Sequence, residues 1–513
     1  MKILLLRRCL VTVALLMTVC DLVAAGDLVR YNCYIGSGLV TPSDSPSRGR
    51  SGLTRAGSPL DIDYARQAWD ANRTYRQLVV LLSFSDCDFS FEDPQATYDA
   101  MFNTPGYTQR DGAGCVADYF RDQSSGLFHL QFDIYGPYQT SGSVKTGSSS
   151  RNEGQSAFRE ATRMLMDEHP DIDFSLYDWD GDGTVEQVVY VYAGYSGNQS
   201  TIVNEGYIWP TTGSFSVINT TDGYQITHYT ASGELWVNNT SCGIGLICHE
   251  FSHCLGLPDI YPTSSSVTDF SIVDEWDLMD GGTATNRGWC PPNYSPMEKM
   301  VMGWLTPKEL TADTTITNLK PIAEGGEAYL VRYNDDEFCL VENRQWSGWD
   351  YGLPGLGLVI YHVNFNRYYW DANIVNNEQG EPNYSLVAAD GRTYTDWYNL
   401  IIESGLRNPY TDSERRLHSK ILSTAPYPWQ DEETCVDQVT LFDEKRLTNI
   451  IQHEDGTVSF SFHTSGSGIQ GVYAEPKATG VYTLSGLKLR DDGLTEMLPK
   501  GIYIVNGQKI VKR

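Results

Sequence analysis

One run of eleven residues constrains the fold more than any other feature of the sequence. It reads His249-Glu250-Phe251-Ser252-His253-Cys254-Leu255-Gly256-Leu257-Pro258-Asp259, with two histidines four positions apart. On a helix that spacing places both imidazoles on one face, where they can hold one metal ion. Glu250 lies between them, close enough to act on a water molecule held there. The run predicts a helix that carries a zinc site.

Zinc in a catalytic site needs a third protein ligand and keeps one open position. Gly256 can take the left-handed conformation that ends a helix, and Pro258 prevents the helix from resuming. The chain can then turn back so that Asp259 reaches the same metal ion. We therefore expect His249, His253 and Asp259 to be the zinc ligands.

Two glutamates further along the chain are alternatives to Asp259. Glu275 and Glu298 follow the second histidine at distances that do not exclude a third ligand from a later helix. Two observations favour Asp259 over them. Gly256 is placed for a turn directly after the helix, and Met279 lies downstream, where a methionine turn would support such a site.

The chemistry expected of this site is hydrolysis of peptide bonds in proteins. Two neutral imidazoles and one carboxylate leave the ion a net positive charge with which to polarise a carbonyl group. Glu250 is expected to accept the proton of the attacking water and to donate it to the leaving amine. The alternative is a surface-exposed binding protein that keeps the fold without turnover. Such a protein has no chemical reason to retain Glu250.

A second candidate metal site is the acidic loop, residues 178–186, with the sequence Asp178-Trp179-Asp180-Gly181-Asp182-Gly183-Thr184-Val185-Glu186. Acidic side chains at alternate positions, with glycines to turn the chain, suit Ca²⁺ because this ion prefers hard oxygen ligands. The calcium ligands that we expect are Asp178, Asp180, Asp182, Thr184 and Glu186. The alternative is an acidic turn exposed to solvent.

The first residues predict an exported protein. Arg7 and Arg8 precede an apolar run over 10–19, and small residues at 24–26 offer a cleavage site, which is typical of a signal peptide over 1–25. Lipidation at Cys20 is the alternative. No later segment has the roughly 20 apolar residues that span a bilayer. We therefore expect a secreted or outer-surface location without a transmembrane segment.

The net charge of −28 argues against nucleic acid as a partner, because nucleic-acid binding needs a basic face. Proteins or peptides are the substrates that the expected zinc site predicts. Cys33 follows the signal peptide and could cap zinc as a thiolate in a latent form. The simpler alternative is an ordinary cysteine in a flexible segment.

Changes in residue pattern predict an α+β fold in several parts. A Ser-, Gly-, Pro- and Arg-rich stretch over 26–74 reads as a flexible leader or pro-segment. Apolar runs at 78–84 and 187–192 predict strands, and the spacing within 156–169 predicts a helix. Short strand-like segments at 329–332 and 357–361 indicate that the later part is rich in β-structure. The expected parts are a catalytic domain over 75–307, a β-rich accessory domain over 308–464 and a tail over 465–513.

Taken together, these residues resemble the immune inhibitor A-type metallopeptidases, which are secreted bacterial enzymes of the metzincin kind. The resemblance runs from about Leu78 to Val363 and is carried by the following segments: 78–85, 117–120, 124–126, 249–259, 276–279, 302–305, 342–344 and 357–363. It implies a metzincin-like catalytic domain in which His249, His253 and Asp259 bind zinc and Glu250 is the catalytic carboxylate. One departure is Met279-Asp280-Gly281, since small residues commonly follow this methionine in the family.

The last part of the chain, from Gly471 to Arg513, is similar to the C-terminal sorting tails of the Por-type (type IX) secretion pathway. Asn506-Gly507 lies between two β-prone runs and predicts a hairpin. The resemblance implies association with the cell surface through this tail.

Overall fold

The computed structural model describes residues 34–35, 69–109, 112–146, 154–199, 202, 205–236, 238–267, 271–404, 421–442, 445–464, 481–482, 488–490, 501–505 and 508–512. The chain forms two compact units, residues 1–463 and 464–513, and each is described here by itself. The predicted signal peptide, Cys20, Cys33 and most of the predicted leader lie outside the described residues.

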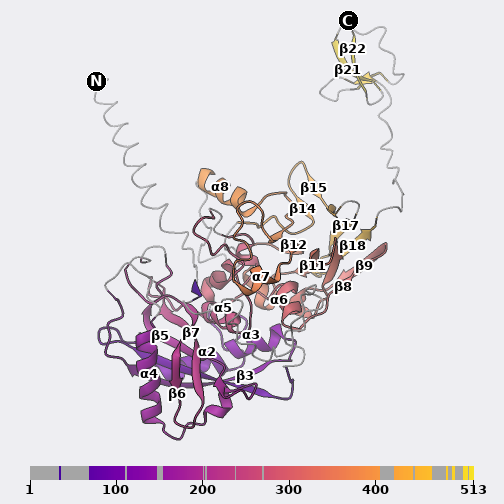
Figure 1. The fold of residues 1–513 in the computed structure, drawn as a ribbon. Coiled ribbons are helices and arrows are strands. Elements are labelled where there is room, and N and C mark those ends of the chain that lie inside the picture. The colour runs from indigo at the N-terminus through magenta and orange to yellow at the C-terminus, as the bar shows by residue number, and fades with distance from the viewer. Residues whose placement is uncertain are drawn as a thin grey trace, which may run out of the picture. The chain divides into compact units, whose positions relative to one another are not determined.

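The first unit is built on a seven-stranded mixed sheet with the order β1-β6-β7-β5-β2-β3, in which β4 also pairs with β7 (Figure 1). The pairs β2–β3, β2–β5, β5–β7 and β1–β6 are parallel, and β6–β7 is antiparallel. The strands of this sheet are β1 (Tyr34–Ile35), β2 (Thr74–Ser83), β3 (His129–Gln139), β4 (Thr184–Val185), β5 (Val188–Tyr195), β6 (Thr211–Asn219) and β7 (Gln225–Leu235).

Helices cover both faces of this sheet because its central strands are apolar on both sides. In β2, Val79 and Leu81 join one buried cluster, whereas Val80 and Leu82 join another, as expected when alternate side chains of a strand point to opposite faces. The first cluster includes residues of α2, α3 and α5, and the second includes residues of α4. These helices are α2 (Pro94–Asn103), α3 (Val116–Gln123), α4 (Gln155–Glu168) and α5 (Gly245–Cys254).

The predicted helix over 156–169 is confirmed as α4. Its Phe158, Ala161 and Leu165 are buried, and Met166 packs against the same cluster. The predicted strands at 78–84 and 187–192 correspond to β2 and β5. The element type and the buried face therefore follow from the spacing of apolar residues.

Between α5 and the second sheet the chain forms short turns of 3-10 helix and one short α-helix, α6. These are η3 (Asp274–Trp276), η4 (Gly281–Gly288) and α6 (Pro296–Val301). Other 3-10 turns of the first unit are η2 (Phe174–Tyr177), before α5, and η5 (Ile322–Glu324) and η6 (Gly348–Gly352), after residue 308.

Residues 308–464 are rich in strands, as the pattern predicts. They form a sheet with the order β13-β12-β11-β10-β8, a second with the order β16-β17-β18-β9 and the pair β14-β15. The strands are β8 (Lys308–Glu309), β9 (Thr314–Leu319), β10 (Tyr329–Arg332), β11 (Glu337–Arg344), β12 (Gly357–Asn364), β13 (Tyr384–Leu386), β14 (Trp429–Gln430), β15 (Cys435–Val436), β16 (Val439–Phe442), β17 (Lys445–Gln452) and β18 (Val458–His463). Two helices that the sequence analysis did not predict, α7 (Arg367–Asp371) and α8 (Tyr394–Ser404), interrupt them.

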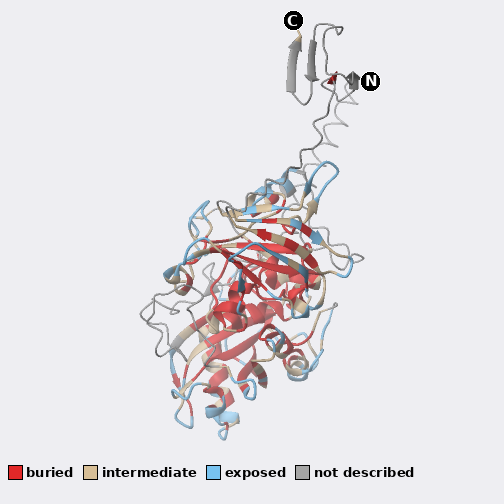
Figure 2. Cartoon of the chain, turned by 90° about the vertical axis from the view of Figure 1, so that its right-hand side faces the viewer, coloured by how far each residue is buried: buried red, intermediate tan, exposed pale blue. Residues whose placement is uncertain are grey.

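One hydrophobic cluster runs from α5 into the sheet with the order β13-β12-β11-β10-β8. It joins Phe251 of α5 and Trp276 of η3 to Leu340 of β11 and Tyr361 of β12. Figure 2 shows the buried segments continuing from one sheet to the other. Arg344, which is fully buried, forms ion pairs with Glu342 and Asp350 in the same region. The residues before and after position 307 therefore share a core, and the domain boundary expected there stays a prediction.

The second unit contains a four-stranded sheet with the order β20-β19-β21-β22. Its strands are β19 (Val481–Tyr482), β20 (Lys488–Arg490), β21 (Gly501–Val505) and β22 (Gln508–Lys512). The predicted hairpin is confirmed, since β21 and β22 pair antiparallel with Val505 opposite Gln508. Among the residues described, no helix has the length and apolar character needed to cross a membrane.

Candidate metal centre

The helix α5 places both histidines of the predicted zinc site on one face. It packs against β6 and β7 of the mixed sheet (Figure 1), and also against η4. His249 and His253 lie one turn apart, with ring centroids separated by 4.8 Å and ring planes at 89°. Their side chains are only 1% and 2% exposed. Two imidazoles are therefore held together in a place largely shielded from water.

A backbone carbonyl fixes the orientation of each imidazole. The Nδ1 atom of His249 lies 2.7 Å from the carbonyl oxygen of Leu278, and that of His253 lies 2.8 Å from the carbonyl oxygen of Leu257. Because a carbonyl can only accept a hydrogen bond, each Nδ1 carries the proton. Each Nε2 is thereby directed at the site and can bind a metal ion once it carries no proton, which is the arrangement usual for histidines that bind a metal.

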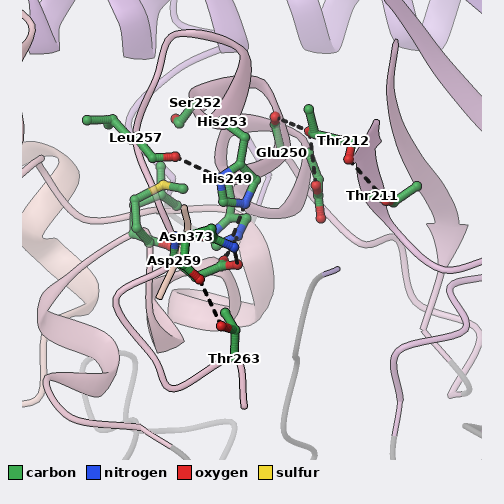
Figure 3. A network of polar contacts seen from close by, with 12 residues as sticks. Thr211, Thr212, His249, Glu250, Ser252, His253, Leu257, Asp259, Thr263 and Asn373 are labelled. Carbon is green, nitrogen blue, oxygen red and sulfur yellow. Dashed lines mark hydrogen bonds and ion pairs between the residues drawn. The ribbon is translucent and has the colours of Figure 1, made fainter. Parts of the chain in front are cut away.

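Asp259 reaches the same point from the return loop, residues 255–264, which follows α5. Gly256 has a φ of 102°, a conformation that favours glycine, and it turns the chain away from the helix axis. As a result, Oδ1 of Asp259 lies 3.2 Å from Nε2 of His249 and 3.3 Å from Nε2 of His253. One ligand atom from each of these three residues lies within 4.8 Å of the others (Figure 3). Two imidazole nitrogens and one carboxylate oxygen form a donor set that suits zinc.

The charges of the three groups are strongly coupled. Burial raises the pKa of Asp259, but the neighbouring His253 and His249 lower it far more, so its pKa lies well below the ordinary value. Burial lowers the pKa of His249, and Asp259 offsets this only in part. For His253 the nearby carboxylates outweigh burial and raise the pKa to about 9. The metal-free centre thus holds an ionised aspartate beside one protonated histidine.

Glu250 faces β6 from the same helix and is fully buried. The hydroxyl of Thr212 donates to its backbone carbonyl at 2.5 Å and lies 3.2 Å from its Oε2 atom (Figure 3). Thr212 is in turn opposite Ile35 of β1, in the parallel pairing of β1 and β6. A carboxylate is therefore held next to the two histidines and beside an edge of the mixed sheet.

The two alternative glutamates lie outside this group of donors. Glu298 accepts a hydrogen bond from the backbone of Ser295 at 2.6 Å, as part of a capping box at the start of α6. Glu275 lies in η3 and is buried. In the described part of the chain, the acidic residue that meets His249 and His253 is Asp259.

The methionine expected below the site lies close to the return loop. Met279 is fully buried, and its carbonyl oxygen accepts a hydrogen bond from the backbone of Ile260 at 2.8 Å. The preceding carbonyl, that of Leu278, orients His249. The segment with Leu278 and Met279 thus holds both His249 and the return loop that carries Asp259.

The acidic loop forms the second group of candidate ligands. Carboxylate oxygens of Asp178, Asp180 and Glu186 lie within 4.8 Å of one another. Asp178 also accepts hydrogen bonds from the backbone of Gly181 and Gly183 at 2.8 and 2.9 Å, which curls the loop around its side chain. Asp182 lies outside this group, and its Oδ1 accepts a hydrogen bond from the backbone of Thr184 at 2.7 Å.

Two residues that contact the metal centre had no signal in the sequence. Asn373, after α7, contacts Asp259 from the β-rich part of the chain, and Thr212 of β6 contacts Glu250. Neither belongs to a motif with a known spacing to the histidines. The one local hint is that three asparagines, Asn373, Asn376 and Asn377, occur close together.

Comparison with known proteins agrees with the chemistry of the centre. Residues 60–304 match a family described as immune inhibitor A peptidase M6, catalytic domain. The chain is also 22% identical over 272 residues to the pre-pro-metalloprotease PrtV of Vibrio cholerae serotype O1 strain M66-2. That alignment covers 47% of this chain and 29% of the relative, and PrtV of strain ATCC 39315 (El Tor Inaba N16961) gives the same values.

The chain thus spans less than a third of the length of the curated relatives that it matches. The predicted resemblance to immune inhibitor A-type enzymes is confirmed over residues 60–304. The matches support a metallopeptidase, as predicted, and such a family implies a bound metal ion, usually zinc.

Proposed function

We propose that this protein is a secreted zinc-dependent endopeptidase that hydrolyses peptide bonds of proteins. The observation that carries the proposal is the buried meeting of His249, His253 and Asp259, with one donor atom from each directed at a common point beside Glu250. Bound zinc would supply Lewis-acid polarisation of water and of the scissile carbonyl group.

In this proposal the protein's own residues divide the remaining work. The carbonyls of Leu278 and Leu257 keep the Nε2 atoms of the histidines directed at the ion. Glu250 accepts a proton from the attacking water on its carboxylate and hands it to the leaving amine. Thr212 restrains that carboxylate from the side of β6.

The test is cleavage of a chemically unfolded protein by the full chain, with and without a zinc chelator. Glu250→Gln should abolish cleavage while the zinc content stays the same. Glu92→Gln, a matched change at an exposed carboxylate, should leave the rate unaltered. Cleavage that persists in chelator, or in Glu250→Gln, would contradict the mechanism. A chain that binds zinc but cleaves nothing would favour the alternative, a surface-exposed binding protein with this fold.

We further propose a metzincin-like catalytic domain over 75–307. The support is the order of parts along the chain: a helix with both histidines, Gly256 at positive φ, Asp259, and the buried Met279 bonded to the return loop. The β-rich domain over 308–464 and the sorting tail over 465–513, with association at the cell surface, are proposed on the sequence pattern.

Calcium binding by the acidic loop is also proposed. The grouped oxygens of Asp178, Asp180 and Glu186 support it, and Asp182 and Thr184 are the other expected ligands. The proposed role is structural, because a loop fixed by an ion is harder for a protease to cleave. Calcium titration of the full chain, followed by limited self-digestion, tests this role. Equal digestion with and without calcium would contradict it.

We propose that residues 26–74 act as a pro-segment. The proposal is supported by β1, which belongs to this segment and pairs with β6. Its Ile35 lies opposite Thr212, and Thr212 contacts Glu250. Cleavage by the precursor and by a chain lacking the leader should differ, with the shorter chain more active. A Cys33→Ala precursor that is no more active than the intact precursor would rule out capping of zinc by Cys33.

A further inference from the structure

The return loop of the metal centre is held by a second loop that lies more than a hundred residues later in the chain. This asparagine loop, residues 372–377, follows α7 in the β-rich part. The hydroxyl group of Thr263 donates a hydrogen bond to the backbone carbonyl of Asn373 at 2.8 Å. The side-chain amide of Asn376 donates one to the backbone carbonyl of Ile260 at 2.7 Å. Asn377 accepts from the backbone of Thr263 at 2.7 Å. Trp370 of α7 adds a hydrogen bond to the carbonyl of Gly256 at 3.2 Å.

Within this contact, Asn373 acts on Asp259 itself. Its Oδ1 accepts a hydrogen bond from the backbone N–H of Asp259 at 2.5 Å, and its Nδ2 donates to Oδ2 of the same residue at 2.7 Å (Figure 3). A backbone N–H can only donate, so the amide oxygen must face it. The amide nitrogen is then necessarily the group that faces the carboxylate. The orientation of the Asn373 side chain is therefore fixed by chemistry.

The two oxygens of Asp259 consequently have different roles. Oδ2 is bonded to Asn373, whereas Oδ1 is the oxygen that lies 3.2 and 3.3 Å from the two Nε2 atoms. An amide that donates to one carboxylate oxygen leaves the other to face a metal ion. Hydrogen-bonded partners of this kind orient metal ligands and contribute to metal affinity.

The backbone of Asn373 fits this role. Its φ is 57°, in the left-handed region, which asparagine tolerates better than most residues. The conformation turns the chain directly after α7, so that the backbone carbonyl of the residue reaches Thr263 while its side chain reaches Asp259. One residue thus holds both the position and the rotation of the carboxylate.

We propose that Asn373 is a positioning residue of the metal centre, and that it holds Asp259 as a one-oxygen ligand. The inference rests on the proposed zinc site. It means that one ligand, Asp259, is oriented by a residue of the β-rich part of the chain, outside the catalytic domain that we expect to end at residue 307. The catalytic and β-rich segments are thus joined at the metal centre itself, in addition to their shared hydrophobic core.

The test is the zinc affinity of the full chain, measured by competition between the protein and a chromogenic chelator for added zinc chloride. Asn373→Gly removes the side chain and keeps the backbone unstrained, because glycine accepts a φ of 57°. We expect this variant to bind zinc about 10–100-fold more weakly. The matched control is Asn377→Ala, which removes a contact between the same two loops without touching Asp259. Its affinity should stay within about two-fold of the unaltered chain, since the outer-shell partner is kept.

Asn373→Asp is the second variant and decides the matter if Asn373→Gly does not fold. It keeps the size of the side chain but places a carboxylate oxygen against Oδ2, so its zinc affinity should fall at least as far. Cobalt chloride in place of zinc gives a readout of geometry. The visible bands should change in both Asn373 variants and match those of the unaltered chain in Asn377→Ala.

Unchanged zinc affinity in the Asn373 variants, or an equal loss in Asn377→Ala, would overturn the proposal, because either result indicates no more than docking of two loops. A full chain that takes up no zinc would overturn this inference and the proposed function together. A chain whose zinc affinity depends on Asn373, but which cleaves no protein, would overturn the peptidase proposal alone.

Discussion

The acidic loop draws its carboxylates from nine consecutive residues, 178–186, whereas the metal centre draws its parts from α5, the return loop, the chain near Leu278 and the asparagine loop. The carboxylates of the acidic loop are held mainly by neighbouring backbone amides, as Asp178 shows. Asp259 is 1% exposed and is held by a residue 114 positions away. Neighbouring residues thus hold the carboxylates of the acidic loop, whereas the orientation of Asp259 depends on a distant segment.

The comparison is tested most severely by removing one carboxylate from each site. Asp259→Ala should empty the zinc centre and reduce cleavage to background, since losing a ligand costs more than the roughly 10–100-fold of an outer-shell partner. Asp180→Ala should leave the zinc content and the cleavage rate unchanged. Metal analysis and cleavage assays on both variants provide the measurement. A loss of zinc in Asp180→Ala would show that the two sites are not independent.

A second test adds calcium to the full chain and follows thermal unfolding. An ion at 100 times its dissociation constant stabilises the folded state by about 2.7 kcal/mol, so the melting temperature should rise by a few degrees. The rise should vanish in Asp180→Ala and persist in Asp259→Ala. The same rise in all three proteins would place the calcium elsewhere.

The glycines of the two sites offer a smaller change. Gly256 has a φ of 102° and Gly181 a φ of 78°, so alanine at either position should cost about 1–2 kcal/mol of folding free energy. Gly256→Ala should also weaken zinc binding, because the return loop carries Asp259. Gly181→Ala should weaken only the response to calcium. Denaturant unfolding combined with zinc competition separates these effects, and equal zinc affinity in the two variants would contradict this division.

The smallest effect that we predict is the release of about one proton when zinc binds at pH 7.5. The raised pKa of about 9 keeps His253 protonated in the metal-free chain below that pH, and the ion must displace this proton to reach Nε2. His249, with a lowered pKa, and Asp259, already ionised, contribute none. The released fraction should therefore fall as the pH rises through about 9. Calorimetry in buffers of different ionisation enthalpy measures it, and release that does not change with pH would be inconsistent with this assignment.

Much of the fold near the sheet could be predicted because its signals are local. The spacing of Phe158, Ala161 and Leu165 identifies α4, and Asn506-Gly507 identifies the hairpin of the second unit. The meeting of His249, His253 and Asp259 also follows from spacing and from one glycine. Each of these features depends on residues that are close together in the sequence.

The parts that could not be predicted depend on contacts between distant segments. Asn373 belongs to no motif, and its contact with Asp259 appears only when the two residues are seen together in the folded chain (Figure 3). Thr212 belongs to no motif either, and its contact with Glu250 appears only when β6 lies beside α5. α7 itself has only five residues, too few for a periodic pattern to stand out.

The distance between Asp259 and Asn373 also sets an order in time. A polypeptide is synthesised from its N-terminus, so the histidines and Asp259 exist before the amide that contacts the carboxylate. A chain that has been synthesised only as far as α6 or β12 carries the three expected zinc ligands but not yet Asn373. The contact that orients the Asp259 carboxylate can therefore form only after synthesis has passed residue 373.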